Sequence, residues 1–390
     1  MQRSPRFAEA RAERGFSLIE LMVGLAIGLF ATLAVTQILV MSEGQKRATA
    51  TGADAQVNGA LALNHLQRVI AQAGYGFAAA PALLGCTVSA VFNGINYTSL
   101  PPFLEPIRIT NGADAMPDTI RIFSSGKTSF SVPLRVLAPG YVPGNTAFPV
   151  ASVRSVEGPR VDATGTPVSP GDLMIAGTYT LTPTPTPTGT ACEVFQVTSD
   201  PTTTVTVNRA NDATKWNAVN RPSGTYPADA LLVNMGQPVD MTFSIVNQVT
   251  NPALAVRTLR LAADSTPTYD GPVELFPNVV SIQALYGKDT NADGAVDLWD
   301  NTTPTTPAGW QTLVAVRLAV LARSSQLERE NITTAHPQWD VGSSVTVTGS
   351  AACSGSQCLE FKVSHLSDWR RYRYQIFETT VPLRNMLWNN

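Results

Sequence analysis

The feature that most constrains the fold is a long apolar segment near the N-terminus, RGFSLIELMVGLAIGLFATLAVTQILVM, at residues 14–41. From Phe16 to Met41 the only charged residue is Glu20. About 20 apolar residues are enough to cross a bilayer as a helix, so this segment predicts a membrane span. Positively charged residues precede it: Arg3, Arg6, Arg11 and Arg14. This asymmetry places the N-terminus in the cytoplasm and most of the chain across the membrane.

The junction between the basic leader and the apolar segment predicts how the chain is processed. An ordinary secretory signal is cut after its apolar stretch, at small residues. Here the expected cleavage site, Gly15/Phe16, lies before that stretch, so removal of residues 1–15 leaves the helix on the mature protein. The alternative is a plain signal anchor that tolerates one acidic residue near the membrane interface.

Glu20 needs a partner if the segment lies in a membrane. An ionised carboxylate in hydrocarbon costs roughly 2.5–3.5 kcal/mol even on lenient insertion scales. No basic residue lies near it in the apolar segment. We therefore expect the α-amino group freed on Phe16, of the same or a neighbouring subunit, to pair with it.

The helix is expected to continue beyond the membrane. Residues 42–73 lack proline, and their apolar positions recur in steps of three and four, which marks one helical face. That face is predicted to consist of Val57, Ala60, Leu63, Leu66, Ile70 and Ala73. Glycines at 44, 52 and 59 weaken the helix by about 1 kcal/mol each relative to alanine. Gly74-Tyr75-Gly76 is expected to stop it.

The remainder of the chain has the composition of a β-rich extracytoplasmic head. Charged residues make up only 14%, with a net charge of −2, which argues against a surface that binds nucleic acid by neutralising phosphates. Several short runs alternate apolar and polar residues, as half-buried strands do. They are 119–123, 202–208, 239–246, 255–261, 313–321, 344–348 and 373–382. The TPTPTPT stretch at 182–188 is expected to be an extended loop within the head.

Four cysteines suit an oxidising compartment. Cys353 and Cys358 enclose a short Ser/Gly loop and are expected to pair, which leaves Cys86 and Cys192 as the second candidate bridge. Zinc is the alternative, but the spacings contain no CxxC pair and no histidine is near in sequence. We therefore favour disulfides.

The stretch DTNADGAVDLWD at 289–300 has the spacing of a calcium loop. Oxygen donors fall at positions one, three, five, seven, nine and twelve, and Gly294 permits the turn at six. The candidate ligands are Asp289, Asn291, Asp293, the carbonyl of Ala295, Asp297 and Asp300. Residues 280–286, which precede it, are expected to form a strand, so no EF-hand helix pair is implied. The alternative is an Asp/Asn/Gly turn that needs no metal.

Two sets of motifs resemble known families. The basic leader, the Gly15/Phe16 junction and Glu20 at the fifth mature position resemble the class III leader of type IV pilins. The resemblance implies cleavage by prepilin peptidase and N-methylation of Phe16. Strings in the head resemble the PilW family of minor pilins: 71–86, 232–239, 280–300, 313–324 and 370–385. Major pilins commonly carry a helix-kinking proline where this chain has Thr36 and Gln37, so the resemblance is to a minor subunit.

The resemblance implies an α+β, pilin-like fold, with a long N-terminal helix packed on a β-rich head that carries large loop insertions. The expected parts are a cleaved leader (1–15), a transmembrane or bundle half of the helix (16–41), its amphipathic half (42–75) and the head (76–390). No GxSxG, P-loop, HExxH or CxxC motif appears, so no enzyme is expected.

The implied function is a minor pilin that primes type IV pilus assembly at the tip. The implied partners are other minor pilins, the major pilin, prepilin peptidase and the inner membrane, with a tip adhesin as a further candidate and no nucleic acid. The location is the inner membrane, as a single span with a periplasmic head, and the pilus tip after assembly. Alternatives are a minor pseudopilin of a type II secretion system and a membrane-anchored, calcium-dependent adhesin.

Overall fold

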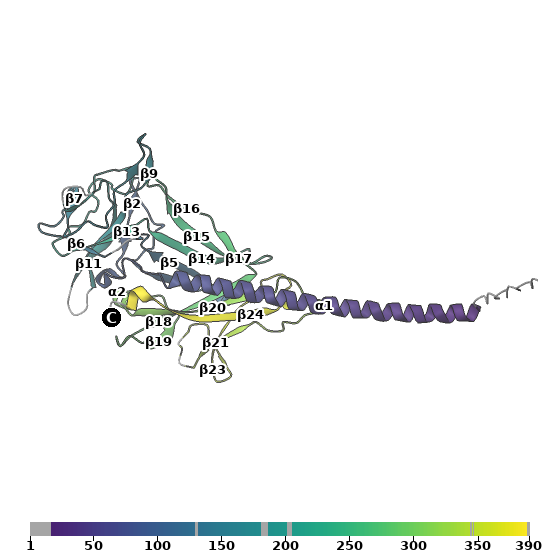
Figure 1. Ribbon diagram of the computed structural model, residues 1–390. Coiled ribbons are helices and arrows are strands. Elements are labelled where there is room, and N and C mark those ends of the chain that lie inside the picture. The colour runs from purple at the N-terminus through teal and green to yellow at the C-terminus, as the bar shows by residue number, and fades with distance from the viewer. Residues whose placement is uncertain are drawn as a thin grey trace, which may run out of the picture. The chain divides into compact units, whose positions relative to one another are not determined.

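One long helix and a β-rich head make up the protein (Figure 1). The computed structural model describes residues 17–128, 132–180, 186–200, 205–343, 345 and 347–387. The helix, α1 (Leu18–Ile70), has 53 residues and is continuous across Ser42, as the sequence predicts. Two compact units meet within it, at residues 52 and 53. In the first unit, the 25 residues Leu18–Ser42 are long and apolar enough to cross a membrane.

The part of α1 that belongs to the head buries a face that differs from the predicted one. Leu66, Ile70 and Ala73 are fully buried, as expected, but Val57 is 55% exposed and Ala60 is exposed as well. The buried face continues toward the N-terminus through Ala62, Gly59 and Ala55 instead. The prediction of Val57 and Ala60 was wrong because the head contacts α1 along the row formed by Ala55, Gly59 and Ala62.

The end of α1 also differs slightly from the expected one. The helix ends at Ile70, and a series of turns follows up to residue 79. Gly74 and Gly76 lie in these turns with φ of +75° and +89°, a backbone region that favours glycine. The two glycines therefore shape the exit from the helix rather than its last residue.

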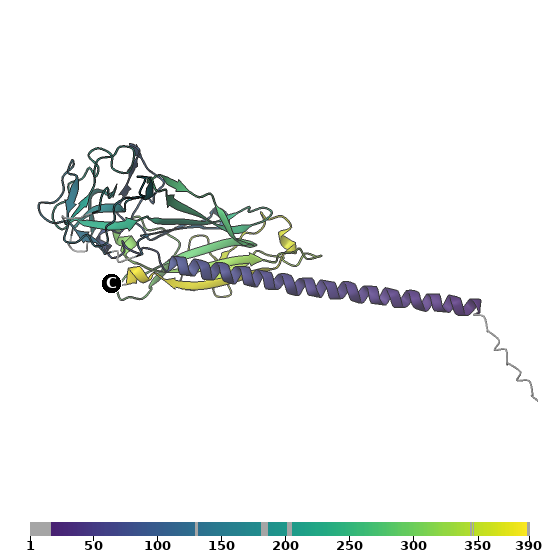
Figure 2. The ribbon, with the colours of Figure 1, turned by 45° about the horizontal axis from the view of Figure 1, so that its top comes forward.

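Two antiparallel sheets pack on the part of α1 that belongs to the head, as both views of the ribbon show (Figures 1 and 2). The larger one has the order β16 (Pro267–Tyr269), β15 (Ala253–Leu261), β14 (Val239–Val246), β5 (Thr119–Ser124) and β4 (Ile107–Thr110), and β17 (Val273–Pro277) also pairs with β15. The four-stranded one has the order β19 (Leu298–Asp300), β18 (Val279–Lys288), β20 (Leu313–Arg323) and β24 (Tyr374–Pro382).

A third sheet and several small ones complete the described part of the head. The third sheet has the order β1 (Val88–Ser89), β11 (Thr186–Gln196), β10 (Leu173–Thr180), β13 (Leu231–Gly236) and β6 (Leu134–Arg135). A three-stranded sheet has the order β21 (Gln338–Gly342), β23 (Ser356–Glu360) and β22 (Ala351–Cys353). The strand pairs are β2 (Val91–Phe92) with β3 (Ile95–Asn96), β7 (Ala147–Pro149) with β12 (Thr206–Asn208), and β8 (Arg160–Val161) with β9 (Pro167–Ser169). The short helices are η1 (Pro81–Leu83), η2 (Ala113–Ala115), α2 (Pro307–Gln311), η3 (Trp369–Arg371) and α3 (Arg384–Leu387).

Three apolar clusters hold these layers together. The main one joins α1 to both large antiparallel sheets, through residues such as Leu66, Phe243 and Val320. A second cluster lies within the third sheet and against β7 and β12. The third packs the other face of the four-stranded sheet on the small sheet around Trp339 and Phe361. The four-stranded sheet is therefore covered on both faces, which explains the nearly continuous apolar sequence of β18 and β20.

Most of the strands predicted by alternation are present, and β14 has the predicted bounds. The prediction at 344–348 was wrong at its described positions, because 345, 347 and 348 lie in a loop. In the TPTPTPT stretch, residues 182–185 lie outside the described residues. Residues 186–188 belong to β11, so the stretch is not wholly a loop.

Candidate assembly site

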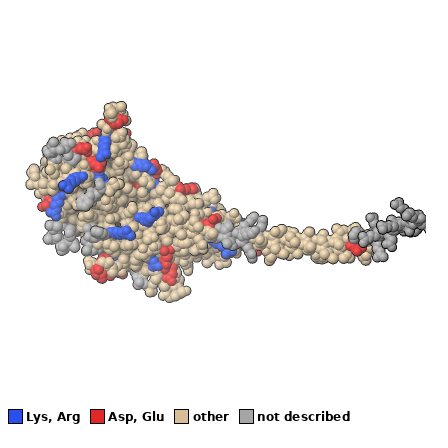
Figure 3. Space-filling view, in the orientation of Figure 1, with Lys and Arg blue, Asp and Glu red and all other residues tan. Residues whose placement is uncertain are grey.

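The N-terminal half of α1 presents apolar side chains all around it. Every residue from 17 to 41 is exposed within the described chain, and several large ones exceed 60%, among them Leu18, Leu25 and Phe30. Figure 3 shows this segment almost free of charge. A helix that is apolar on every side belongs in a membrane or in a bundle of other helices. The exposure and the composition of this segment fit such an environment.

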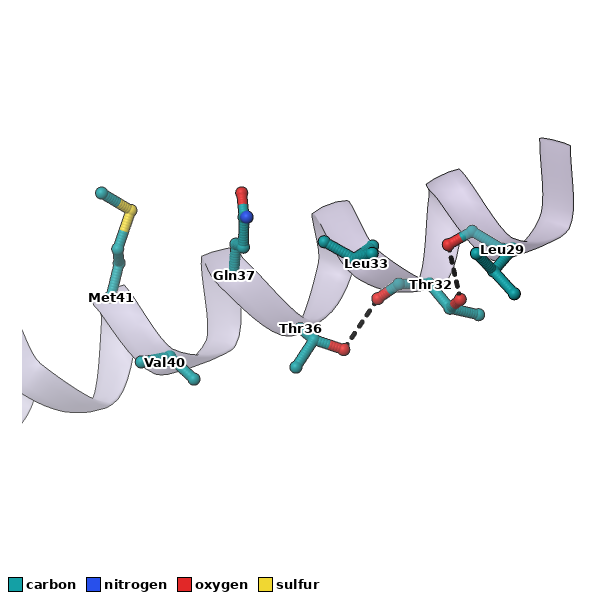
Figure 4. Close-up of a pocket in the computed structure, with 7 residues that line it drawn as sticks. All are labelled: Leu29, Thr32, Leu33, Thr36, Gln37, Val40 and Met41. Atoms are coloured by element: carbon teal, nitrogen blue, oxygen red, sulfur yellow. Dashed lines mark hydrogen bonds between the residues drawn. The ribbon is translucent and has the colours of Figure 1, made fainter. Parts of the chain in front are cut away.

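Two threonines of this segment make their hydrogen bonds within the helix itself. The hydroxyl of Thr32 donates to the carbonyl of Leu29 (2.9 Å), and that of Thr36 donates to the carbonyl of Thr32 (2.7 Å) (Figure 4). With Val40 and Met41, these residues line a shallow groove along one side of the helix. Hydroxyl groups bonded in this way enter an apolar environment at low cost.

Glu20 lies in the first turn of α1 and is exposed. A carboxylate near a helix N-terminus is favoured by the helix dipole. Gly24 and Gly28 follow Glu20 at spacings of four residues. At either glycine, no atom lies within 4 Å of the position that a Cβ would take. The predicted cleavage site, Gly15 and Phe16, lies outside the described residues.

The predicted calcium loop follows β18, and four of its six candidate ligand residues are linked within it. The carboxylate of Asp289 accepts the backbone N–H groups of Ala292 and Gly294, each at 2.7 Å. The side-chain amide of Asn291 donates to Asp293 (3.1 Å) and to Asp297 (3.2 Å). Gly294 has φ of +85°, the conformation expected at the turn.

Of the other two candidate ligands, Asp300 lies outside the loop and Ala295 lies within it. Asp300 belongs to β19, and its carboxylate pairs with the ammonium group of Lys288 at 2.7 Å. Ala295 donates its N–H to Asp293 (2.8 Å). Backbone N–H groups of Thr290 and Asn291 reach the carboxylate of Asp297, and the hydrogen bond from Thr290 holds its pKa below the usual value. The described loop is therefore closed by its own hydrogen bonds.

Both predicted disulfides are present. Cys86 pairs with Cys192, which ties the segment before β1 to β11. Cys353 pairs with Cys358 across the hairpin of β22 and β23. Among the described residues, the carboxylate of Asp340 lies within 4.8 Å of both hairpin sulfurs. These are only three of the four ligands that a structural zinc takes, and the two sulfurs are already bonded to each other.

Sequence reasoning missed two buried carboxylates that organise the head. Glu193 accepts hydrogen bonds from Ser223, Gly224 and Tyr226 and pairs with Arg221 at 2.6 Å. Burial opposes its ionisation, yet these hydrogen bonds hold its pKa below the ordinary value. The second is Asp118, which joins the two large antiparallel sheets. No motif surrounds either residue, so only the partners that the fold brings together could reveal them.

The chain is similar to two protein families. Residues 242–385, from β14 to α3, match the family model described as Type IV Pilus-assembly protein W. Residues 10–36, which cover the leader junction and most of the apolar helix, match the Prokaryotic N-terminal methylation motif. No curated protein and no solved structure gives a significant match. The methylation motif and the apolar helix indicate membrane anchoring. A prepilin-type N-terminus and a PilW region in the head together support a PilW-type pilin with a role related to the type IV pilus.

Proposed function

We propose that this chain is a minor pilin that primes type IV pilus assembly at the tip by packing with other minor pilins. The observation that carries the proposal is the helix Leu18–Ser42, whose apolar side chains have no partner among the described residues. Such a helix is stable in lipid and equally stable in a bundle of similar helices. Assembly then transfers it from one apolar environment to another without large cost.

The head sets which subunits lie beside this one. Its two disulfides and its three apolar clusters make it a fixed surface. The chain is held in the inner membrane, with its head in the periplasm, until prepilin peptidase removes residues 1–15 and Phe16 is N-methylated. It then enters the tip beside other minor pilins and above the major pilin. The role is structural rather than catalytic, in keeping with the families that it matches.

The test is deletion of the gene, followed by electron microscopy of surface pili and recovery of minor pilins with an affinity-tagged chain. We expect few or no pili, restoration by the full-length gene, and recovery of other minor pilins with the tagged protein. Normal pili with loss of protein secretion would favour a pseudopilin instead. Normal pili with loss of surface attachment would favour an adhesin.

We also propose that the loop 289–297 binds calcium. Asp289, Asn291, Asp293 and Asp297 already lie in one closed turn, and three of them are carboxylates that a cation would hold together. A hard cation takes 6–8 oxygen ligands, so carbonyls such as that of Ala295 and water would complete the shell. The pairing of Asp300 with Lys288 supports a site of fewer carboxylates, at the weak end of the range, about 10⁻⁴–10⁻³ M.

The calcium proposal is tested by thermal unfolding of the full chain in detergent, with chelator or with millimolar calcium. Binding to the folded state alone raises stability by RT ln(1 + [L]/Kd), which is about 1.4 kcal/mol at a tenfold excess of calcium over Kd. The rise should vanish in Asp293→Asn. It should persist in Asp212→Asn, a matched control, because Asp212 closes a similar exposed turn by accepting the N–H of Thr214. An unchanged melting curve for the wild type would leave this loop as an ordinary turn.

A further inference from the structure

Among the strands that the structure describes, β24 is the longest that lies at the edge of a sheet. β24 has nine residues and is the last strand of the four-stranded sheet. The other strands at the edges of described sheets have five residues or fewer. None of the residues 374–380 is buried, whereas ten of the eleven residues of the neighbouring β20 are. Figure 2 shows β24 beside α1, at the margin of the head.

The register with β20 identifies which backbone groups of β24 point outward. Hydrogen bonds run from Ser324 N–H to the Arg373 carbonyl and from Leu383 N–H to the Val314 carbonyl, each at 2.8 Å. The pairing between these two points has no register shift. Because inward and outward positions alternate in an antiparallel pair, Arg373 and every second residue after it face β20. The outward positions are therefore Tyr374, Ile376, Glu378, Thr380 and Pro382.

These outward groups form a ready hydrogen-bonding row. In the described chain, no group accepts from the N–H of Tyr374, Ile376, Glu378 or Thr380, and none donates to their carbonyls. Pro382, which has no N–H, occupies an outward position, as proline does at sheet edges. From Tyr374 to Thr380 the row extends for about 20 Å at 3.4 Å per residue.

Apart from Pro382 at its end, the edge lacks the features that normally protect such strands. Natural edges are short, bulged, covered, or marked with lysine or proline. β24 contains no lysine, and its one acidic residue, Glu378, is bound on the sheet face by Arg317 at 2.9 Å. Arg373, just before the strand, is paired with Glu328 at 2.7 Å. With both charges neutralised, the edge fits an uncharged extended strand rather than a charged one.

We propose that the outer edge of β24 accepts an extended, uncharged strand from the head of another pilin subunit, which adds a fifth strand to this sheet. Main-chain hydrogen bonds provide the affinity, and residues opposite Tyr374, Ile376 and Thr380 provide the selectivity. This inference rests on the proposed function, because it specifies how the head of this subunit contacts its neighbour.

The test is residue-resolved amide hydrogen exchange on the full chain in detergent, alone and in complex with the other minor pilins. Pairing at the edge should slow exchange at least tenfold at the outward amides of Ile376, Glu378 and Thr380. The inward amides of Gln375 and Phe377 should be protected in both states.

A pair of variants separates edge pairing from folding. Thr380→Pro removes one outward N–H without touching the bonds to β20, whereas Thr380→Val keeps it. Both should melt at the wild-type temperature, and only the proline variant should lose at least tenfold in recovery with the complex. A complex that forms while the outward amides still exchange rapidly would overturn this inference and leave the proposed function intact. Failure to join any minor pilin would overturn both. Concentration-dependent protection in the purified chain alone would mean pairing between two copies and would also overturn it.

Discussion

One buried carboxylate, that of Asp118, makes the stability of the head depend on pH. Asp118, 2% exposed, accepts the N–H of Gly112 from the loop after β4 and the N–H of Ala284 from β18, both at 2.9 Å. It thereby connects the two large antiparallel sheets. Burial outweighs these two hydrogen bonds and raises the pKa of Asp118 to about 7.

The raised pKa of Asp118 predicts a loss of stability as pH rises. The folded state holds a proton that the unfolded state, with a pKa near 4, has already released. The free energy of unfolding therefore falls between about pH 4 and pH 7, by about 1.4 kcal/mol per pH unit and about 4 kcal/mol in total from this group. Asp118→Asn lacks this dependence. Urea unfolding of the full-length wild type and of Asp118→Asn, in detergent at several pH values, measures this dependence. If the free energy of unfolding changes equally with pH in the two proteins, the prediction is contradicted.

Little in the sequence points to Asp118. It stands in an ordinary turn sequence, MPDTI, before β5. Its partners are Gly112, six residues earlier, and Ala284, far away in β18. Its pKa depends on burial by a sheet whose pairing is not local. The loop at 289–297 is the opposite case, since every partner lies within nine residues and the spacing alone indicated the turn.

The contact between α1 and β24 depends on one glycine. A Cβ at Gly59 would lie 2.2 Å from the ring of Phe377, so any side chain there forces the ring to move. From sequence, Gly59 counted only as a weak point in the helix. Its role could not be predicted because Phe377 is more than three hundred residues away in the chain. The same close approach explains why the buried face runs through Ala55 and Gly59.

Gly59→Ala should therefore destabilise the protein although alanine favours helix. The helix gains about 1 kcal/mol, but overpacking against Phe377 costs about 1–3 kcal/mol. In a Phe377→Leu background the ring is absent, and Gly59→Ala should then stabilise. A double-mutant cycle measured by thermal unfolding of the four full-length proteins tests this reversal. The same effect of Gly59→Ala in both backgrounds would exclude a contact with Phe377.

The two disulfides differ in how much chain they constrain. Cys86–Cys192 closes 106 residues and Cys353–Cys358 closes 5. The loop-closure model gives about 5 kcal/mol for the first and about 2 kcal/mol for the second. We expect the double Cys→Ala replacement at 86 and 192 to lower the free energy of unfolding more than the replacement at 353 and 358. Urea titrations of the oxidised proteins compare them, and the reverse order would show that native contacts, not chain entropy, dominate.

The whole chain combines a span that the sequence predicts well with a head that it predicts only in part. The apolar helix needs no tertiary information, since its length and composition alone decide its environment. The strands of the head were found wherever one face is polar, as in β14. Strands buried on both faces, such as β10, lack that alternation, and their pairing joins segments that lie far apart in the chain.

Incorporation of the full chain from the membrane into the pilus should depend on Glu20. Its carboxylate is expected to pair with an N-terminal amine. This pairing offsets the cost of an ionised carboxylate in hydrocarbon, which is roughly 2.5–3.5 kcal/mol. Glu20→Ala makes the span more apolar, so cleavage after Gly15 and retention in the membrane should be normal. The variant should nevertheless be missing from sheared pili, because the pairing that orders subunits is lost.

Glu20→Asp is the matched control, since it keeps the charge and should retain at least part of the incorporation. Mass spectrometry of the membrane fraction for an N-methylated Phe16, and immunoblots of sheared pili, measure the two steps separately. Residues 1–15 found on the mature wild-type protein in cells with active peptidase would contradict the cleavage site. Wild-type amounts of Glu20→Ala in pili would show that the helix bundle forms by apolar packing alone.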